Sequence, residues 1–184
     1  YQKKYSSDKN DIFSNLNIIS VCRFVDQKNI KEFIQIAEKL NKYNFVLIGN
    51  GPRWNDVKNL INKKGLKNIY LLGIKKNVFN YLNKSNIYLS TSLYEGLPIS
   101  IIEAMSIGLP IVASNVTGNS DAVIHGKSGY LYRLGDIDMA VIYLKKLLRS
   151  YKLRYKFGKE SYNLQRSDFS IERMKNDYME LYKN

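Results

Sequence analysis

The chain has 184 residues, of which 45% are hydrophobic and 24% are charged, and its formal net charge at pH 7 is +13. These values predict one globular domain with a buried core and exclude a wholly disordered chain. No apolar run approaches the ~20 residues of a membrane-spanning helix, and the opening residues lack a signal peptide's apolar core, so we expect a cytoplasmic protein.

The basic charge indicates which classes of ligand the protein could bind, and the single cysteine limits disulfide and zinc sites. Such a charge suits small phosphorylated substrates, an anionic surface at the inner face of the membrane, or nucleic acid. Because the lysines are spread along the chain and form no block, nucleic acid is the least favoured of the three. Cys22 is the only cysteine and cannot form an internal disulfide, and no His/Cys cluster predicts a zinc site. The chain does not begin with methionine, and we expect it to be part of a larger protein.

Short apolar strands alternate with amphipathic helices along the chain. In chain order, we expect strands over residues 17–22, 45–49, 69–72, 87–89, 110–113 and 129–132. The helices expected between and after them cover residues 29–40, about 57–65, 78–82, 98–107, 137–148 and 170–182. Near-continuous apolar strands that alternate with helices are typical of a mostly parallel sheet covered on both faces. The predicted fold class is therefore α/β, with a Rossmann-like, doubly wound sheet.

The last expected helix carries an apolar stripe although it follows the sheet's final layer. The stripe consists of Ile171, Met174, Tyr178, Leu181 and Tyr182. Two interpretations stay open at this point. The stripe packs on this same domain, or it docks on a partner domain that is not part of this chain.

Four groups of polar residues and glycines follow the strands of the predicted sheet. In sheets of this class, ligands bind outside the carboxyl ends of the strands. The groups are RFVDQK with Arg23 and Lys28, GNGP (Gly49 to Pro52), LGI (Leu72 to Ile74), and YEGLPISIIEAM with Glu95 and Glu103. We therefore expect these four groups to meet at one edge of the sheet.

Together the groups suit a nucleoside diphosphate joined to a sugar. Two cations and the N-terminus of the helix at Pro98 can stabilise a diphosphate, and glycines allow close backbone approach. Carboxylates accept paired hydrogen bonds from vicinal hydroxyls. The sequence has neither the dinucleotide pattern G-x-G-x-x-G nor a phosphate loop of the form G-x-x-x-x-G-K-[ST]. Glu103 is the most informative residue, because its surroundings in sequence are apolar; the alternative is a partly exposed helix acid.

The run from Ser90 to Tyr132 carries a longer pattern. Glu95 and Glu103 are separated by seven residues, and GLPIVA follows at positions 108–113. This run resembles the retaining glycosyltransferases of family four, whose hallmark is E-x7-E followed by G-x-P-[IV]-[IV]-A. The likeness extends over about residues 17–184.

The resemblance implies a GT-B architecture, in which two Rossmann-like domains face each other across a cleft. This chain resembles the C-terminal, donor-binding domain. Residues 1–16 would then be a leader or interdomain linker, and residues 17–166 the nucleotide-sugar-binding domain. Residues 167–184 would form a helix that docks on the absent N-terminal domain.

The resemblance also implies roles for single residues. Arg23 and Lys28 would hold the diphosphate, and with Glu95, which would contact the donor sugar, they form the expected catalytic set. Glu103 would accept hydrogen bonds from the ribose hydroxyls. The other expected donor-binding residues are Gly49, Gly51, Gly73, Ile74, Gly96, Leu97, Pro98 and Ile99, of which Gly73 and Ile74 would border the base.

The activity implied is sugar transfer from a UDP- or GDP-linked donor to a glycan or glycolipid acceptor, with retained configuration and no metal or other cofactor. Three positions depart from the usual pattern of the family: Cys22 and Asn29, where glycine is frequent, and Thr91, where proline is frequent. His125 lies where the family has no catalytic histidine, so we expect a structural or surface role. The alternatives are a GT-B epimerase or hydrolase and a non-catalytic nucleotide-sugar-binding module. The isolated domain should transfer sugar poorly.

Overall fold

The computed structural model describes residues 12–13 and 15–182 of the chain. Its strands are β1 (Asn17–Val21), β2 (Asn44–Ile48), β3 (Ile69–Leu71), β4 (Ile87–Ser90), β5 (Ile111–Ser114) and β6 (Gly129–Tyr132). Its helices are η1 (Asp26–Lys28), α1 (Ile30–Lys39), α2 (Trp54–Lys63), α3 (Val78–Lys84), α4 (Ile99–Ser106), α5 (Asn119–Ala122), α6 (Ile137–Arg149), α7 (Tyr151–Asp168) and α8 (Ile171–Leu181). Among these residues, no helix is both long and apolar enough to cross a membrane.

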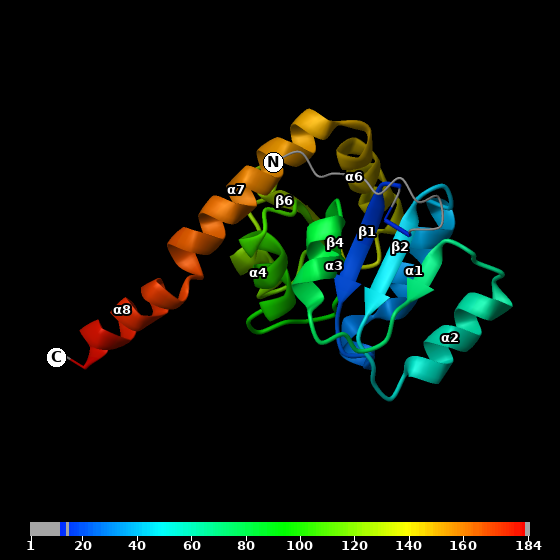
Figure 1. Ribbon diagram of the computed structural model, residues 1–184, viewed down its shortest axis with the longest axis horizontal. Helices are drawn as coiled ribbons and strands as arrows, with labels where there is room; N and C mark the ends of the chain where they lie inside the picture. The colour runs from blue at the N-terminus through cyan, green and yellow to red at the C-terminus, as the bar shows by residue number, and fades with distance from the viewer. Residues whose placement is uncertain (1–11, 14, 183–184) are drawn as a thin grey trace.

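The strands form one six-stranded sheet in the order β3-β2-β1-β4-β5-β6, and all neighbouring pairs are parallel. Helices cover both faces (Figure 1). One core packs α1, α2 and α6 against the sheet, and a second core packs α3 and α4 against the other face. The predicted doubly wound, Rossmann-like sheet is confirmed, since apolar β-branched runs are buried between two helical layers.

The sheet divides into two halves between β1 and β4. β1 pairs with β2 over its whole length but with β4 at only two positions, Ile18 and Ile19. At Val21, the Tyr88 hydroxyl replaces a strand partner: it donates to the Val21 carbonyl at 3.1 Å and accepts from the Val21 N–H at 3.3 Å. A side chain thus stands between the carboxyl ends of the two strands. This is the topological switch point of the sheet, where ligands of such folds bind.

The sequence prediction missed α7, the longest helix of the described chain. Its inner face contains Phe157, Gly158 and Ser161, and Leu153 and Leu164 pack against the two cores. A Cβ on Gly158 would lie 2.3 Å from the Gly108 carbonyl oxygen, which shows how closely α7 approaches the end of α4. Because Tyr151 and Tyr155 are exposed and two of the inner residues are small, aromatic residues on the outer face obscure the hydrophobic periodicity of this helix.

The chain ends in an arm formed by the far part of α7 and by α8, which extends away from the sheet (Figure 1). Ile171, Met174, Tyr178 and Tyr182 of the predicted stripe are all exposed. In the described structure, these four side chains of the stripe are therefore not buried against this domain. The side chain of Leu181 lies outside what the structure describes.

The segment before β1 packs on the domain where the structure describes it. Phe13 is buried in the core beneath α3, with its ring centroid 6.1 Å from that of Tyr81. The Asn44 side-chain amide donates to the Ile12 carbonyl at 2.8 Å. The predicted linker over residues 1–16 therefore has a packed end, and residues 1–11 lie outside the described part of the chain.

Candidate functional site

An ion pair joins two of the predicted site residues at the carboxyl edge of the sheet. Lys28 closes η1 after β1, and Glu95 follows β4, its neighbour in the sheet. The Lys28 ammonium lies 2.5 Å from Glu95 Oε1, and the two side chains are only 19% and 9% exposed. Because the pair is shielded from water, its attraction is stronger than that of an exposed pair.

Two residues that sequence reasoning missed complete the surroundings of Glu95. The Ser92 hydroxyl donates to Glu95 Oε1 at 2.6 Å. The Gln27 side-chain amide donates to the Tyr94 carbonyl at 2.9 Å and reaches Glu95 Oε2 at 3.5 Å. The Glu95 carboxylate is therefore held in one orientation, ready to accept from a ligand on its remaining open side.

The predicted glycines of the GNGP turn face protein backbone. A Cβ on Gly49 would lie 1.9 Å from the Cys22 carbonyl oxygen, and one on Gly51 would lie 2.5 Å from that of Phe24. Close packing between this turn and the loop after β1 is thus sufficient to explain both glycines. Their contact with a donor stays a prediction.

The remaining predicted loop residues line the same edge of the sheet. Gly73 accepts a hydrogen bond from the Gly49 N–H at 3.0 Å, so the turns after β2 and β3 are joined. Ile74 is 76% exposed beside them. Arg23 is exposed just after β1, and its guanidinium group has no hydrogen-bond or ion-pair partner among residues 12–13 and 15–182, although its carbonyl accepts from the Val25 N–H. The side chains of Arg23 and Ile74 are thus available to a ligand.

The segment between Glu95 and α4 is open to solvent on its outer side. Gly96 has nothing within 4 Å of its Cβ position, and Leu97 and Ile99 are exposed, whereas Pro98 is buried. Pro98 is the N-cap of α4, and no described side chain caps the first amides of this helix. An uncapped helix N-terminus is a suitable place for a phosphate.

Glu103 lies one turn beyond Ile99 on the same face of α4. It is half-buried, because Ala104 and Met105 take the inner face of the helix, which agrees with the alternative of a partly exposed helix acid and not with a buried carboxylate. Its carboxylate has no hydrogen-bond or ion-pair partner in the described chain. Desolvation nonetheless raises the pKa of Glu103. The structure thus leaves an acceptor available without bringing it into contact with Lys28 or Glu95.

A further glycine shapes the site from a distant part of the chain. Gly118 has a φ of +82°, and a Cβ there would lie 2.3 Å from the Gly96 carbonyl oxygen and 2.7 Å from that of Glu95. The segment before α5 thus supports the backbone that carries Glu95. In the sequence, only the glycine itself could have indicated this supporting role, because the residues around it form no recognisable pattern.

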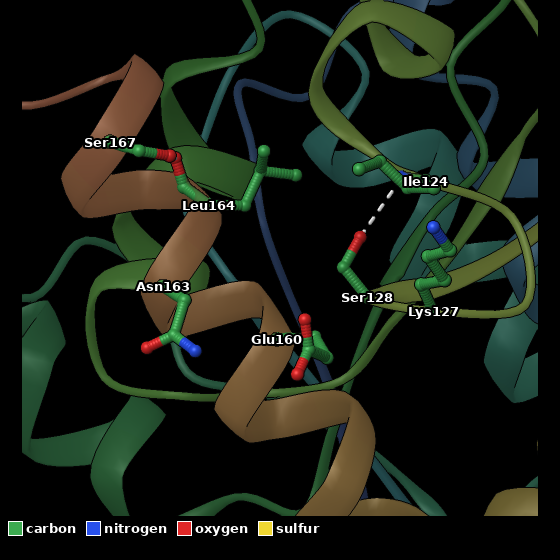
Figure 2. A pocket seen from close by; sticks show the side chains of 7 residues that line it. All are labelled: Ile124, Lys127, Ser128, Glu160, Asn163, Leu164 and Ser167. Atoms are coloured by element: carbon green, nitrogen blue, oxygen red, sulfur yellow. Dashed lines mark hydrogen bonds between the residues drawn. The ribbon is translucent and has the colours of Figure 1, made fainter.

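Other polar features lie away from this edge. Figure 2 shows a pocket of about 260 Å³ between α7, which supplies Glu160 and Asn163, and the segment with Lys127 and Ser128. His125 is exposed, and its Nδ1 accepts from the Leu131 N–H at 3.1 Å, in keeping with a structural role. In the described residues, no cluster of three or more His, Cys, Asp or Glu side chains could hold a metal ion.

Comparison with known proteins identifies the family. The family described as glycosyl transferases group 1 matches residues 3–164. The chain belongs to this family. An uncharacterised glycosyltransferase of Methanocaldococcus jannaschii is 34% identical to it over 149 residues, which cover 71% of this chain and 36% of the relative.

Two relatives of this glycosyl transferase family bear on chemistry. The UDP-Gal:alpha-D-GlcNAc-diphosphoundecaprenol alpha-1,3-galactosyltransferase of Escherichia coli is 37% identical over 126 residues, covering 64% of this chain and 33% of that enzyme. TarM of S. aureus, solved as a point mutant with Fondaparinux, alpha-GlcNAc-glycerol and UDP, is 25% identical with a TM-score of 0.87, covering 98% of this chain and 38% of TarM. The fold is that of a GT-B glycosyltransferase's C-terminal domain, and the chain spans about a third of these relatives.

Proposed function

We propose that this chain is the donor-binding domain of a retaining glycosyltransferase that makes bacterial surface polysaccharide or glycolipid. It would take a sugar from a UDP- or GDP-linked donor and transfer it to a glycan or glycolipid acceptor. The shielded ion pair between Lys28 and Glu95, beside the uncapped N-terminus of α4, is the observation that carries the proposal. UDP in the solved structure of TarM supports a nucleotide at such a site.

The reaction would use these residues in distinct roles. As the bond between the sugar's anomeric carbon and the diphosphate oxygen breaks, its electron pair stays with the nucleoside diphosphate. Arg23, Lys28 and the first amides of α4 would stabilise this charge. Glu95 would accept from hydroxyls of the donor sugar, and Glu103 from those of the ribose. The acceptor hydroxyl would bond to the anomeric carbon, and its proton would pass to the departing diphosphate oxygen.

We expect a second domain to bind the acceptor. The exposed stripe on α8, Ile171, Met174, Tyr178 and Tyr182, would dock on an N-terminal GT-B domain outside this chain. Burying several large apolar side chains stabilises such an interface by about 1 to 2 kcal/mol each. The chain alone would therefore bind donor but transfer sugar poorly.

A GT-B epimerase or hydrolase and a non-catalytic binding module are the competing functions. An epimerase or hydrolase consumes a nucleotide sugar without an acceptor, so product analysis of the full-length enzyme separates it from a transferase. A binding module would retain donor affinity and form no product. The Lys28–Glu95 pair favours chemistry over simple binding, because it places a cation and a fixed acceptor at one point.

Substituting glutamine for Glu103 tests the proposed donor site. Desolvation raises the pKa of Glu103, so ionisation of its carboxyl group destabilises the folded state. The free energy of unfolding therefore decreases as pH rises through the folded-state pKa. Glu103→Gln should therefore unfold at a higher temperature than wild type at pH 7, and this gain should shrink near pH 4. The same variant should bind donor about 10-fold more weakly, because a neutral amide accepts weaker hydrogen bonds than a carboxylate.

Calorimetric titration with UDP-, GDP- and ADP-sugars, together with thermal unfolding, checks both effects. Glu160→Gln is the control, since Glu160 lies beside the pocket on α7, away from the proposed site. Unchanged donor affinity in Glu103→Gln would contradict the assignment of Glu103. Binding of none of the three donor classes by wild type would contradict the proposed function itself.

A peripheral contact with an anionic membrane is part of the proposed function. The exposed face of α7 gathers tyrosines and cations: Tyr151, Lys152, Tyr155, Lys156, Lys159, Tyr162 and Arg166. Tyrosine suits the membrane interface, and each cation near an anionic surface contributes about 1 kcal/mol. The acceptor of the related E. coli enzyme is named as a diphosphoundecaprenol, which is a lipid.

Reversing charges on α7 should weaken vesicle binding. Lys152→Glu/Lys156→Glu should reduce co-sedimentation with vesicles of phosphatidylglycerol by about 10-fold or more, because it changes the local charge by four units. Lys58→Glu/Lys63→Glu on α2 makes the same change in charge elsewhere and should retain most binding. Equal losses in the two variants, or equal binding to neutral phosphatidylcholine vesicles, would overturn α7 as the contact.

A further inference from the structure

A buried carboxylate lies behind the loop that carries Lys28. Glu32, in the first turn of α1, is only 4% exposed. The Tyr132 hydroxyl donates to its Oε1 at 2.8 Å, and the Asn29 side-chain amide donates to its Oε2 at 2.8 Å. Both oxygens are thus used, one by the end of β6 and one by the residue that follows Lys28. Burial raises the pKa of Glu32.

The backbone at Asn29 adopts an unusual conformation. Its φ of +46° is the only positive value among the non-glycine residues that the structure describes. This left-handed conformation costs most residues about 1 kcal/mol and asparagine less, so contacts around Asn29 can decide whether it is kept. Asn29 is the N-cap of α1, yet its side chain makes no capping hydrogen bond and donates to Glu32 instead.

The same turn is held from its other side by the segment after β4. The Thr91 hydroxyl lies 3.0 Å from the Lys28 carbonyl and 3.2 Å from that of Asn29, donating to both. The Leu93 N–H donates to the Gln27 carbonyl at 2.8 Å. The turn from Gln27 to Asn29 therefore lies between the strand that leads to Glu95 and the buried Glu32.

We infer that Glu32 is a positioning residue, which holds Asn29 in its left-handed conformation and thereby directs Lys28 toward Glu95. The inference rests on the proposed function, since it assumes that Lys28 meets the donor. A carboxylate suits the role because Tyr132 and Asn29 donate to its two oxygens and the Gly135 backbone adds a further hydrogen bond. Glutamine offers one acceptor oxygen, and its amide would face the second donor. A role in stability alone is the competing explanation, because Glu32 also joins α1 to β6.

A double variant separates positioning from stability. Glu32→Ala should weaken UDP binding by about 10-fold, because Asn29 loses the group that holds it. Adding Asn29→Gly should return UDP affinity to within about two-fold of wild type, since glycine adopts a positive φ without support. The unfolding temperature should stay low in the double variant, because the hydroxyl of Tyr132 still lacks its partner. Glu38→Ala is the control, since Glu38 is also on α1 but pairs with Lys64 at the surface.

Hydrogen exchange of the 184-residue chain without ligand gives a second measurement. Amides of residues 25–29 should exchange about 10-fold faster in Glu32→Ala and at nearly the wild-type rate in the double variant. Glu32→Gln, which keeps the volume, should fall between them and covers the case that Glu32→Ala does not fold. If the double variant does not recover both the wild-type exchange rates and the wild-type UDP affinity, the inference is overturned. Restored exchange with no binding of either UDP or GDP by wild type would leave the positioning role standing and contradict the proposed function.

Discussion

Replacing Lys28 with alanine should weaken UDP binding by about 100-fold, the free-energy equivalent of losing one or two charge-assisted contacts to a phosphate. The same change leaves the Glu95 carboxylate, 9% exposed, without its cation. Ser92 still donates to Glu95, so we expect a loss of about 2 kcal/mol in the free energy of unfolding and retention of the fold. Titration with UDP and urea unfolding measure the two effects.

Lys39→Ala is the matched control for this variant. Lys39 also forms an ion pair, with Asp138, but there the two side chains are 49% and 79% exposed. Water screens such a pair, and its loss should change the free energy of unfolding by less than about 1 kcal/mol and leave UDP binding unchanged. A similar loss of UDP affinity in both variants would show that overall positive charge, and not the position of Lys28, governs binding.

Substituting alanine for Gly118 should disturb both the fold and the site. The new Cβ would lie 2.3 Å from the Gly96 carbonyl oxygen, and the φ of +82° would also strain any L side chain. We expect a loss of about 3 kcal/mol in the free energy of unfolding, part from strain and part from the clash. Because the backbone of Glu95 and Gly96 must move, UDP affinity should fall by at least about 10-fold.

Gly126→Ala separates strain from contact. Gly126 has nearly the same φ, +77°, but nothing lies within 4 Å of its Cβ position. This variant should lose only about 1 kcal/mol in the free energy of unfolding and keep its affinity for UDP. Equal effects on affinity in the two alanine variants would contradict the role of Gly118 as a support for the site.

The fold could be predicted from sequence where burial is uniform. Runs such as those at residues 17–22 and 45–49 are apolar on both faces, because helices cover both sides of the sheet, and the observed strands differ by a residue at most at either end. α7 was missed because its inner face combines Phe157 with the small residues Gly158 and Ser161 while exposed tyrosines lie on its outer face, so its apolar pattern is weak. α5 and η1 are four and three residues long, too short to show a period.

The site could be predicted in part. The order of Arg23, Lys28, Glu95 and Glu103 along the chain indicated a common edge, because the carboxyl ends of parallel strands meet there. The direct pairing of Lys28 with Glu95 was not predicted, since Lys28 was expected to contact the diphosphate of the donor and Glu95 its sugar. Contacts across long sequence separations, such as Tyr132 with Glu32 over 100 residues, leave no local pattern in one sequence.

The most direct test is to map where UDP binds on the chain. Titration with UDP to about 1 mM, followed by amide chemical shifts, would locate the site without any substitution. If UDP binds at the edge of the sheet between β1 and β4, the largest changes in amide chemical shift should occur at residues 23–28 and 95–103. Shifts centred on α7 and residues 124–128, or no shifts with UDP or with GDP titrated in the same way, would contradict a nucleotide-sugar site at Lys28 and Glu95.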